Sequence, residues 1–125
     1  MAKRKRRPSV RRAGRVIPVT GNCFEECADY VLRAAMLGRD LVLVHGEVAG
    51  RGPLEGLTFA HAWVEDGDEV IDVTKDVRLP RHLYYALGAI DQIGNMYRYT
   101  AEQINALGAA TGRWGPWELV TSTGL

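Results

Sequence analysis

Three residues of this chain have the types and the order that a thiol-based active site needs: Cys23, His61 and Asp72. A thiol can attack a carbonyl carbon, an imidazole can take the proton of the thiol, and a carboxylate can orient the imidazole. Cys23 opens a segment with a helical pattern, whereas His61 and Asp72 flank a tight-turn signal, Asp66-Gly67. The pattern predicts a nucleophile, a general base and an orienting group.

The expected hairpin places His61 and Asp72 on one face of a sheet. If Asp66-Gly67 forms a two-residue turn, His61 lies directly opposite Asp72, with Cβ atoms about 4.5–5.5 Å apart. If Gly67-Asp68 forms the turn, the two residues share a face diagonally. In both registers one imidazole nitrogen can bind the carboxylate while the other accepts the thiol proton.

The segment that begins at Cys23 predicts an amphipathic helix over residues 23–37, capped by Asn22. The dipole and the free amides at its start are expected to lower the pKa of the Cys23 thiol. Glu25 and Glu26 oppose this effect, so a nearby imidazolium is also required. The Cys23 amide is a candidate donor to a developing oxyanion.

The remaining patterns indicate the elements that must position these residues. Leu41-Val42-Leu43-Val44 is apolar on both faces, as expected of a central strand, and Thr100 is a typical helix cap. The aromatic segment 112–117 is expected to pack back on the body. The fold class is therefore α+β: an N-terminal helix packed on an antiparallel β-meander, followed by C-terminal helices. The expected strands cover about residues 41–48, 56–65 and 68–74, and the later helices about residues 81–88 and 101–110.

Composition predicts one globular domain over residues 16–125, preceded by a basic arm over residues 1–15. The 125 residues are 46% hydrophobic, which is ordinary for a globular protein. No apolar run is as long as a membrane span and no signal-peptide pattern is present, so a cytoplasmic protein without membrane contact is expected. Two cysteines do not indicate a disulfide framework.

The charge is distributed unevenly along the chain. The first fifteen residues hold eight basic side chains and no acidic one, whereas the remaining residues hold eight basic and fifteen acidic side chains. Such an arm predicts contact with nucleic acid or another polyanion, with a solubilising or self-docking tail as the alternative. The basic residues of the arm are Lys3, Arg4, Lys5, Arg6, Arg7, Arg11, Arg12 and Arg15.

Structural alternatives exist for several of these residues. Cys23 could be an ordinary core residue, and Cys27, one turn further on the apolar face, is interpreted as core. His45 is interpreted as structural, and Trp63 as a packing residue beside the site or a wall of the substrate cleft. A zinc site of two cysteines and two histidines is the main chemical alternative, but the spacing is unlike that of paired zinc knuckles. No metal or cofactor is expected.

Three segments together resemble the core of the transglutaminase-like and papain-like cysteine enzymes, over about residues 20–75. They are Gly21-Asn22-Cys23 at a helix start, His61-Ala62-Trp63-Val64-Glu65, and Asp72-Val73-Thr74. The resemblance implies that Cys23 is the nucleophile, His61 the general base and acid, and Asp72 the orienting group. The papain-like pattern has an oxyanion-hole glutamine before the cysteine. This chain has none there, so Asn22 and Trp63 are the substitute candidates. The region from residue 97 to residue 117 is similar to small uncharacterised bacterial and phage proteins, which imply no activity.

These observations predict a small cysteine enzyme that acts on amide or isopeptide bonds of a peptide or protein substrate. Peptidase, amidase, deamidase and acyl transferase activities all fit the pattern. The alternative is a non-catalytic binding protein of the same fold whose basic arm contacts nucleic acid or an acidic partner.

Overall fold

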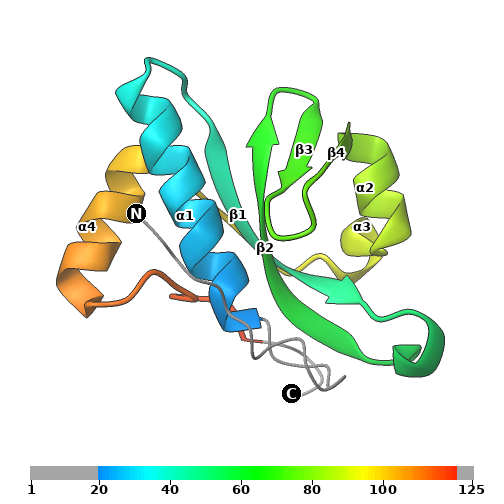
Figure 1. Cartoon of the computed structure of the whole chain (residues 1–125). Helices are drawn as coiled ribbons and strands as arrows, with labels where there is room; N and C mark the ends of the chain where they lie inside the picture. Colours follow the sequence, from blue (N-terminus) through cyan, green and yellow to red (C-terminus); the bar gives the residue numbers. More distant parts are fainter. Residues whose placement is uncertain (1–19, 121–125) are drawn as a thin grey trace.

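A five-stranded antiparallel sheet forms the centre of the molecule, with helices on both of its faces (Figure 1). This computed structural model describes residues 20–120, and the side chains from residue 23 onward. The strand order is β4-β3-β2-β1-β5. The elements in chain order are α1 (Thr20–Met36), β1 (Val42–Ala49), η2 (Gly52–Leu54), β2 (Thr58–Asp66), β3 (Glu69–Asp72), β4 (Val77–Pro80), α2 (Arg81–Leu87), α3 (Ile90–Ile93), β5 (Met96–Tyr99) and α4 (Ala101–Thr111).

The larger hydrophobic core lies between α1 and the sheet. The apolar stripe of α1 that includes Phe24, Cys27 and Val31 packs against Leu43 of β1 and Val64 of β2. Burial of these side chains is the main force that holds the helix on the sheet, at about 1.5–3 kcal/mol for each large side chain. The core therefore fixes the start of α1, where Cys23 lies, against the middle of β2.

A smaller core lies on the opposite face of the sheet, beneath α2 and α3. Val44, Trp63 and Val70 point to this face, where Tyr85 of α2 and Ile90 of α3 cover them. Successive residues of a strand point to opposite faces, so Trp63 belongs to this core while its neighbours Ala62 and Val64 belong to the other. The sheet is thus a partition between two packed layers.

The β2–β3 hairpin has the register in which Gly67-Asp68 forms the turn. Val64 pairs with Ile71, Glu65 with Val70, and Asp66 with Glu69, so Gly67 and Asp68 form the turn. Gly67 has a φ of 63°, which suits the first central position of a type II′ turn. The expectation of Asp66-Gly67 as the turn is wrong, and His61 and Asp72 are diagonal rather than directly opposed.

The α+β class and the N-terminal helix on an antiparallel sheet are confirmed, and the sheet is larger than predicted. Strand β4 extends the meander, and β5 pairs with β1 at the other edge. Helix α4 begins at the predicted cap, Thr100, which forms a reciprocal capping box with Gln103. Trp117 packs on the body, as expected. The basic arm lies outside the described residues.

Candidate active site

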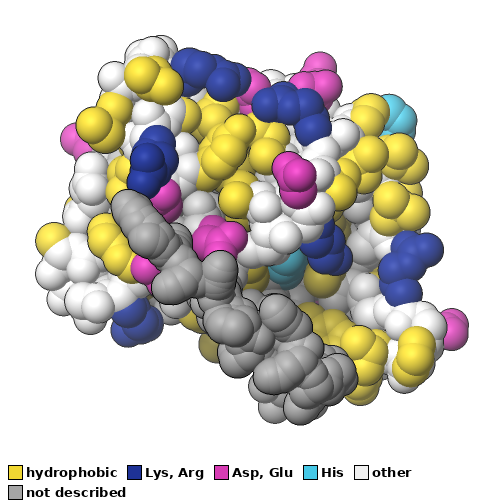
Figure 2. All heavy atoms as spheres, in the orientation of Figure 1, with side chains coloured by type: hydrophobic (Ala, Val, Ile, Leu, Met, Phe, Trp, Pro, Cys, Tyr) yellow, Lys and Arg dark blue, Asp and Glu magenta, His cyan; other side chains and the backbone are white. Residues whose placement is uncertain are grey.

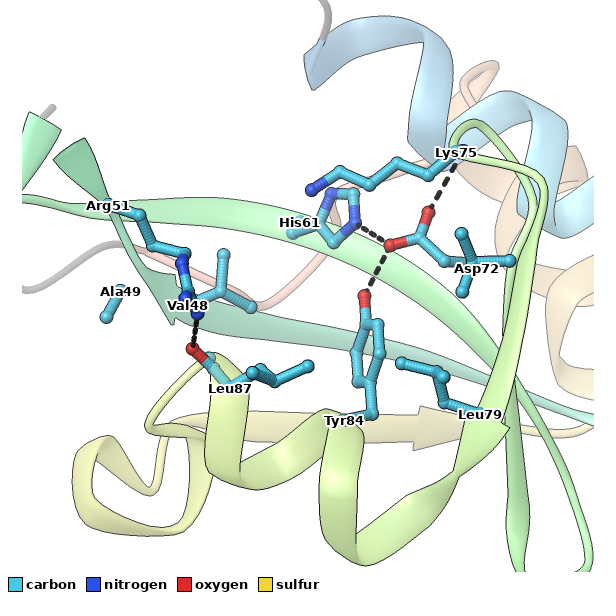
Figure 3. Close-up of a pocket in the computed structure, with 11 residues that line it drawn as sticks. Val48, Ala49, Arg51, His61, Asp72, Lys75, Leu79, Tyr84 and Leu87 are labelled. Carbon is cyan, nitrogen blue, oxygen red and sulfur yellow. Dashed lines mark hydrogen bonds and ion pairs between the residues drawn. The ribbon is translucent and has the colours of Figure 1, made fainter. Parts of the chain in front are cut away.

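The side chains of His61 and Tyr84 both contact one carboxylate oxygen of Asp72 (Figure 3). The Nε2 atom of His61 lies 3.0 Å from Oδ2 of Asp72, and the hydroxyl of Tyr84 donates to the same oxygen at 2.6 Å. Because an ionised carboxylate only accepts hydrogen bonds, Nε2 of His61 carries the proton in this arrangement. The other ring nitrogen, Nδ1, is then the atom that can act as a base.

Asp72 is suited to remain ionised in this site. Its side chain is only 1% exposed. Burial alone would raise its pKa, but the hydrogen bond and charge of His61, the Tyr84 hydroxyl and the charge of Lys75 together lower the pKa below its usual value. The second oxygen, Oδ1, accepts from the Thr74 hydroxyl at 3.3 Å and from the Lys75 backbone amide at 3.4 Å.

Cys23 lies in the first turns of α1, and its side chain is buried against β2. The helix begins three residues earlier than predicted, at Thr20, so Asn22 is helical rather than capping and Cys23 is the fourth helical residue. Burial raises the pKa of the Cys23 thiol to about 12, although the backbone amide of Ala62 favours the thiolate. The charge of Asp72 also raises it. The expected low thiol pKa is therefore wrong for this conformation, because desolvation outweighs the helix start.

Cys23 and His61 approach the same short stretch of β2 from two sides. The Cys23 side chain belongs to the core on the α1 face together with Ala62, whereas His61 lines a pocket on the α2 face. His61 lies beyond Val64, the last residue of β2 that pairs with β3, so it stands at the open end of the hairpin. The structure thus brings His61 and Asp72 into contact. It places Cys23 beside Ala62, the residue that follows His61, where the charge of Asp72 still affects the thiol.

Of the two oxyanion-hole candidates, Trp63 and Asn22, the structure describes the side chain of Trp63 alone. Trp63 is fully buried, and its indole N–H donates to Glu65 at 3.2 Å. Its ring packs against Tyr84 and Tyr85, and it is not among the residues that line the pocket of His61. Trp63 is therefore a residue of the smaller core, beneath α2 and α3. The side chain of Asn22 lies outside the described part of the chain, so its role stays a prediction.

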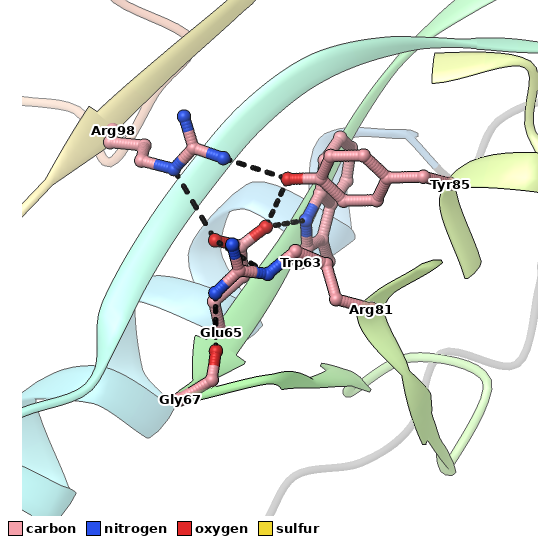
Figure 4. Close-up of polar contacts among 6 residues, drawn as sticks. All are labelled: Trp63, Glu65, Gly67, Arg81, Tyr85 and Arg98. Carbon is pink, nitrogen blue, oxygen red and sulfur yellow. Dashed lines mark hydrogen bonds and ion pairs between the residues drawn. The ribbon is translucent and has the colours of Figure 1, made fainter. Parts of the chain in front are cut away.

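The buried carboxylate of Glu65 on β2 forms hydrogen bonds that connect this strand with α2 and β5 (Figure 4). Its oxygens accept from Trp63 Nε1, from the Tyr85 hydroxyl, and from Nε of Arg98 at 3.3 Å. Arg98 also donates to the Tyr85 hydroxyl at 2.8 Å. Through these bonds Glu65 links β2 to β5 and to α2, the helix that carries Tyr84.

A second histidine, His45, occupies the core on the α1 face. It is fully buried, and neither ring nitrogen has a hydrogen-bond partner among the described residues. The rings of Phe24, Tyr99 and Trp117 surround it, with centroids 4.7, 4.9 and 5.2 Å away. Burial lowers the pKa of His45 to about 4, so the ring is neutral at pH 7 and packs as an aromatic side chain.

A pocket of about 340 Å³ opens next to His61 and Asp72. Tyr84, Leu87 and Val48 form part of its lining, and Arg51 and Lys75 lie at its edge (Figure 3). Tyr84 is a residue of this site that the sequence patterns do not predict. No local signal identifies it, because its contact with Asp72 depends on how α2 packs.

The N-terminal helix packed on an antiparallel sheet is consistent with the result of comparing the sequence with protein families. A sequence model of the transglutaminase-like superfamily matches residues 3–84. The chain belongs to the transglutaminase-like superfamily. This match includes Cys23, His61, Asp72 and Tyr84, and it ends before α3. Members of this superfamily are typically cysteine enzymes.

Searches among curated proteins and among solved structures give no match for this transglutaminase-like chain. Within residues 20–120, no group of three or more histidine, cysteine or acidic side chains is arranged to hold a metal ion. None of the helices in this part of the chain is both long and apolar enough to span a membrane.

Proposed function

We propose that this transglutaminase-like protein is a cysteine enzyme that acts on amide or isopeptide bonds through Cys23, His61 and Asp72. The contact between His61 and Asp72 is the observation that supports this proposal. With Nε2 of His61 3.0 Å from Oδ2 of Asp72, the ring proton is held on Nε2, and Nδ1 is left as the basic atom. Such a pair has the geometry required of a base and the group that orients it.

In the proposed first step, the Cys23 side chain moves out of the core on the α1 face to the open end of the hairpin, gives its proton to Nδ1 of His61, and attacks the substrate carbonyl carbon with its sulfur. The raised pKa of the thiol means that the resting enzyme holds a protonated cysteine. Proton transfer therefore accompanies the attack instead of preceding it. Asp72, which stays ionised, stabilises the imidazolium that forms.

The tetrahedral intermediate then collapses to a thioester. The carbon–nitrogen bond breaks, and the leaving amine takes the proton from His61. Water or a second amine next attacks the thioester with His61 as base, and the sulfur leaves as the Cys23 thiol. Attack by water gives a peptidase, amidase or deamidase, and attack by an amine gives an acyl transferase.

A small activated ester tests this assignment on the full chain. After p-nitrophenyl acetate is added, intact-mass and peptide mass spectrometry should locate one acetyl group on the sulfur of Cys23. The Cys27→Ser variant should keep this adduct, whereas Cys23→Ser and His61→Gln should lose it. An adduct that persists in Cys23→Ser, or that forms equally fast in His61→Gln, would contradict the proposal.

The charge asymmetry supports a second candidate function, in which the arm of residues 1–15 binds a polyanion. Lysine and arginine contacts to phosphate release counterions, so such binding weakens as salt increases. Fluorescence anisotropy with labelled DNA of mixed sequence measures it. Deletion of residues 1–15 should abolish salt-sensitive binding, and unchanged binding after the deletion would contradict this function.

A further inference from the structure

The pocket beside His61 has a composition that suggests what it binds. We call this cavity the Leu87 pocket. Its apolar walls include Val48, Leu79 and Leu87, and His61 and Asp72 form its polar end. Its volume of about 340 Å³ lies at the lower end of the range for ligand sites, which is roughly 300–1,000 Å³. A cavity of this size suits one side chain and its neighbouring groups.

The walls of the Leu87 pocket are mostly apolar, although charged side chains lie next to them. Leu87 remains 45% exposed and Val77, which also lines the cavity, 37% exposed. Exposed aliphatic side chains that line a concavity gain free energy when an apolar group covers them, at about 25 cal/mol per Å² removed from water. The pocket is therefore complementary to an apolar side chain.

The charges around the Leu87 pocket are positive. Arg51 donates to the backbone oxygen of Leu87 at 3.1 Å, which holds its guanidinium at the edge of the cavity. The side chain of Lys75 extends past His61 on the other side (Figure 3). Among the described residues that line the cavity, Asp72 is the only acidic one, and it is buried and bound to His61 and Tyr84.

The space-filling view shows the side-chain types on one face of the molecule. A histidine side chain is visible there with hydrophobic and basic side chains next to it, and acidic side chains lie further away on the same face (Figure 2). An acidic group at the edge of the pocket would meet two cations, whereas a basic group would be repelled by both.

We infer that the Leu87 pocket binds an apolar side chain of a peptide substrate whose adjacent residue carries a carboxylate. This inference rests on the proposed function, because the pocket contains the proposed base and would hold the substrate beside it. The aliphatic walls select the apolar side chain, and Arg51 and Lys75 select the neighbouring negative charge.

Binding of short peptides to the Cys23→Ser variant tests the inference without turnover. The probes are capped tetrapeptides, Ala-Leu-Glu-Ala and Ala-Glu-Leu-Ala, compared with versions in which Gln replaces Glu or Gly replaces Leu. Titrations followed by NMR give the dissociation constants. At least one of the two parent peptides should bind about tenfold more tightly than both of its own substituted versions, and added salt should weaken only the peptides with Glu.

Matched variants then locate the binding site. Leu87→Ser and Lys75→Gln should each weaken the preferred peptide about tenfold. Leu83→Ser, on the same helix and 40% exposed but outside the pocket, should not, and neither should Arg33→Gln, whose ion pair with Asp29 lies on α1. Thermal unfolding confirms that each variant is folded. Absence of binding, equal binding of all peptides, or unchanged binding in both pocket variants would overturn the inference.

The acetylation experiment distinguishes this inference from the proposed function. Selective peptide binding without acetylation of Cys23 would leave the pocket assignment standing and remove the catalytic one. Acetylation of Cys23 without selective binding would do the reverse.

Discussion

The hydroxyl of Tyr84 donates a hydrogen bond of 2.6 Å to Oδ2 of Asp72, an oxygen that His61 also contacts. Tyr84 lies on α2, whereas Asp72 ends β3, so this bond couples the position of the helix to the orientation of the carboxylate. Burial and the charge of Asp72 raise the pKa of Tyr84, so its hydroxyl remains a donor across the working pH range. Tyr84 is therefore a positioning residue in the proposed mechanism.

Replacement of Tyr84 by phenylalanine should weaken this positioning while the fold persists. A hydrogen bond to a charged group contributes about 1.5–3 kcal/mol, so kcat/KM should fall about tenfold or more. Asp72 loses one of the bonds that lower its pKa, so that pKa should rise. Carboxyl NMR titration measures the pKa directly. A lower kcat/KM with an unchanged Asp72 pKa would show that Tyr84 acts only through packing.

The Cys23 thiol should react slowly with alkylating agents at neutral pH. Only the thiolate is a good nucleophile, and with a pKa of about 12 its fraction rises about tenfold for each unit of pH between 7 and 10. Iodoacetamide labelling of the Cys27→Ala variant, which keeps one thiol, measures this dependence. A rate that levels off near pH 7 would show that the thiol is activated at rest and would contradict the buried, protonated state.

The elements of the hairpin could be predicted from sequence, but its register could not. Asp66-Gly67 and Gly67-Asp68 are both good turn dipeptides, and the choice depends on where Gly67 uses its positive φ. The shared face of His61 and Asp72 was predictable all the same, because both registers preserve it. Their contact at 3.0 Å also depends on side-chain conformations that let the two residues meet diagonally, and the sequence does not specify these conformations.

Tertiary packing explains most of what sequence patterns did not reveal. The four residues of β5, Met96–Tyr99, become a strand because they pair with β1, far away in the chain. Likewise, the pKa of Cys23 depends on how completely α1 and β2 bury it, which a helix-start pattern does not encode. The Glu65 cluster is a third example, since its partners come from β2, α2 and β5.

The Glu65 cluster should contribute strongly to stability. Glu65→Ala removes the acceptor of two buried donors, Trp63 Nε1 and the Tyr85 hydroxyl, and leaves Arg98 without its carboxylate. The free energy of unfolding should fall by about 3 kcal/mol. The control is Glu69→Ala, which breaks an exposed ion pair with Arg78 at 2.6 Å and should cost less than about 1 kcal/mol. Urea denaturation of both variants measures the difference, and equal losses would show that the cluster adds nothing specific.

His45 should make the fold sensitive to mild acid. In the folded chain burial lowers its pKa from 6.5 to about 4, so between these pH values the unfolded chain binds a proton that the folded chain excludes. Stability is therefore unaffected above pH 6.5 and falls as the pH decreases, by up to about 3 kcal/mol near pH 4. His45→Leu should flatten this slope, whereas His82→Gln, an exposed control, should leave it unchanged. Urea denaturation at intervals between pH 7 and pH 4 gives the slopes. Equal slopes in the wild type and His45→Leu would mean that other groups, such as Asp72 with its lowered pKa, account for the acid sensitivity.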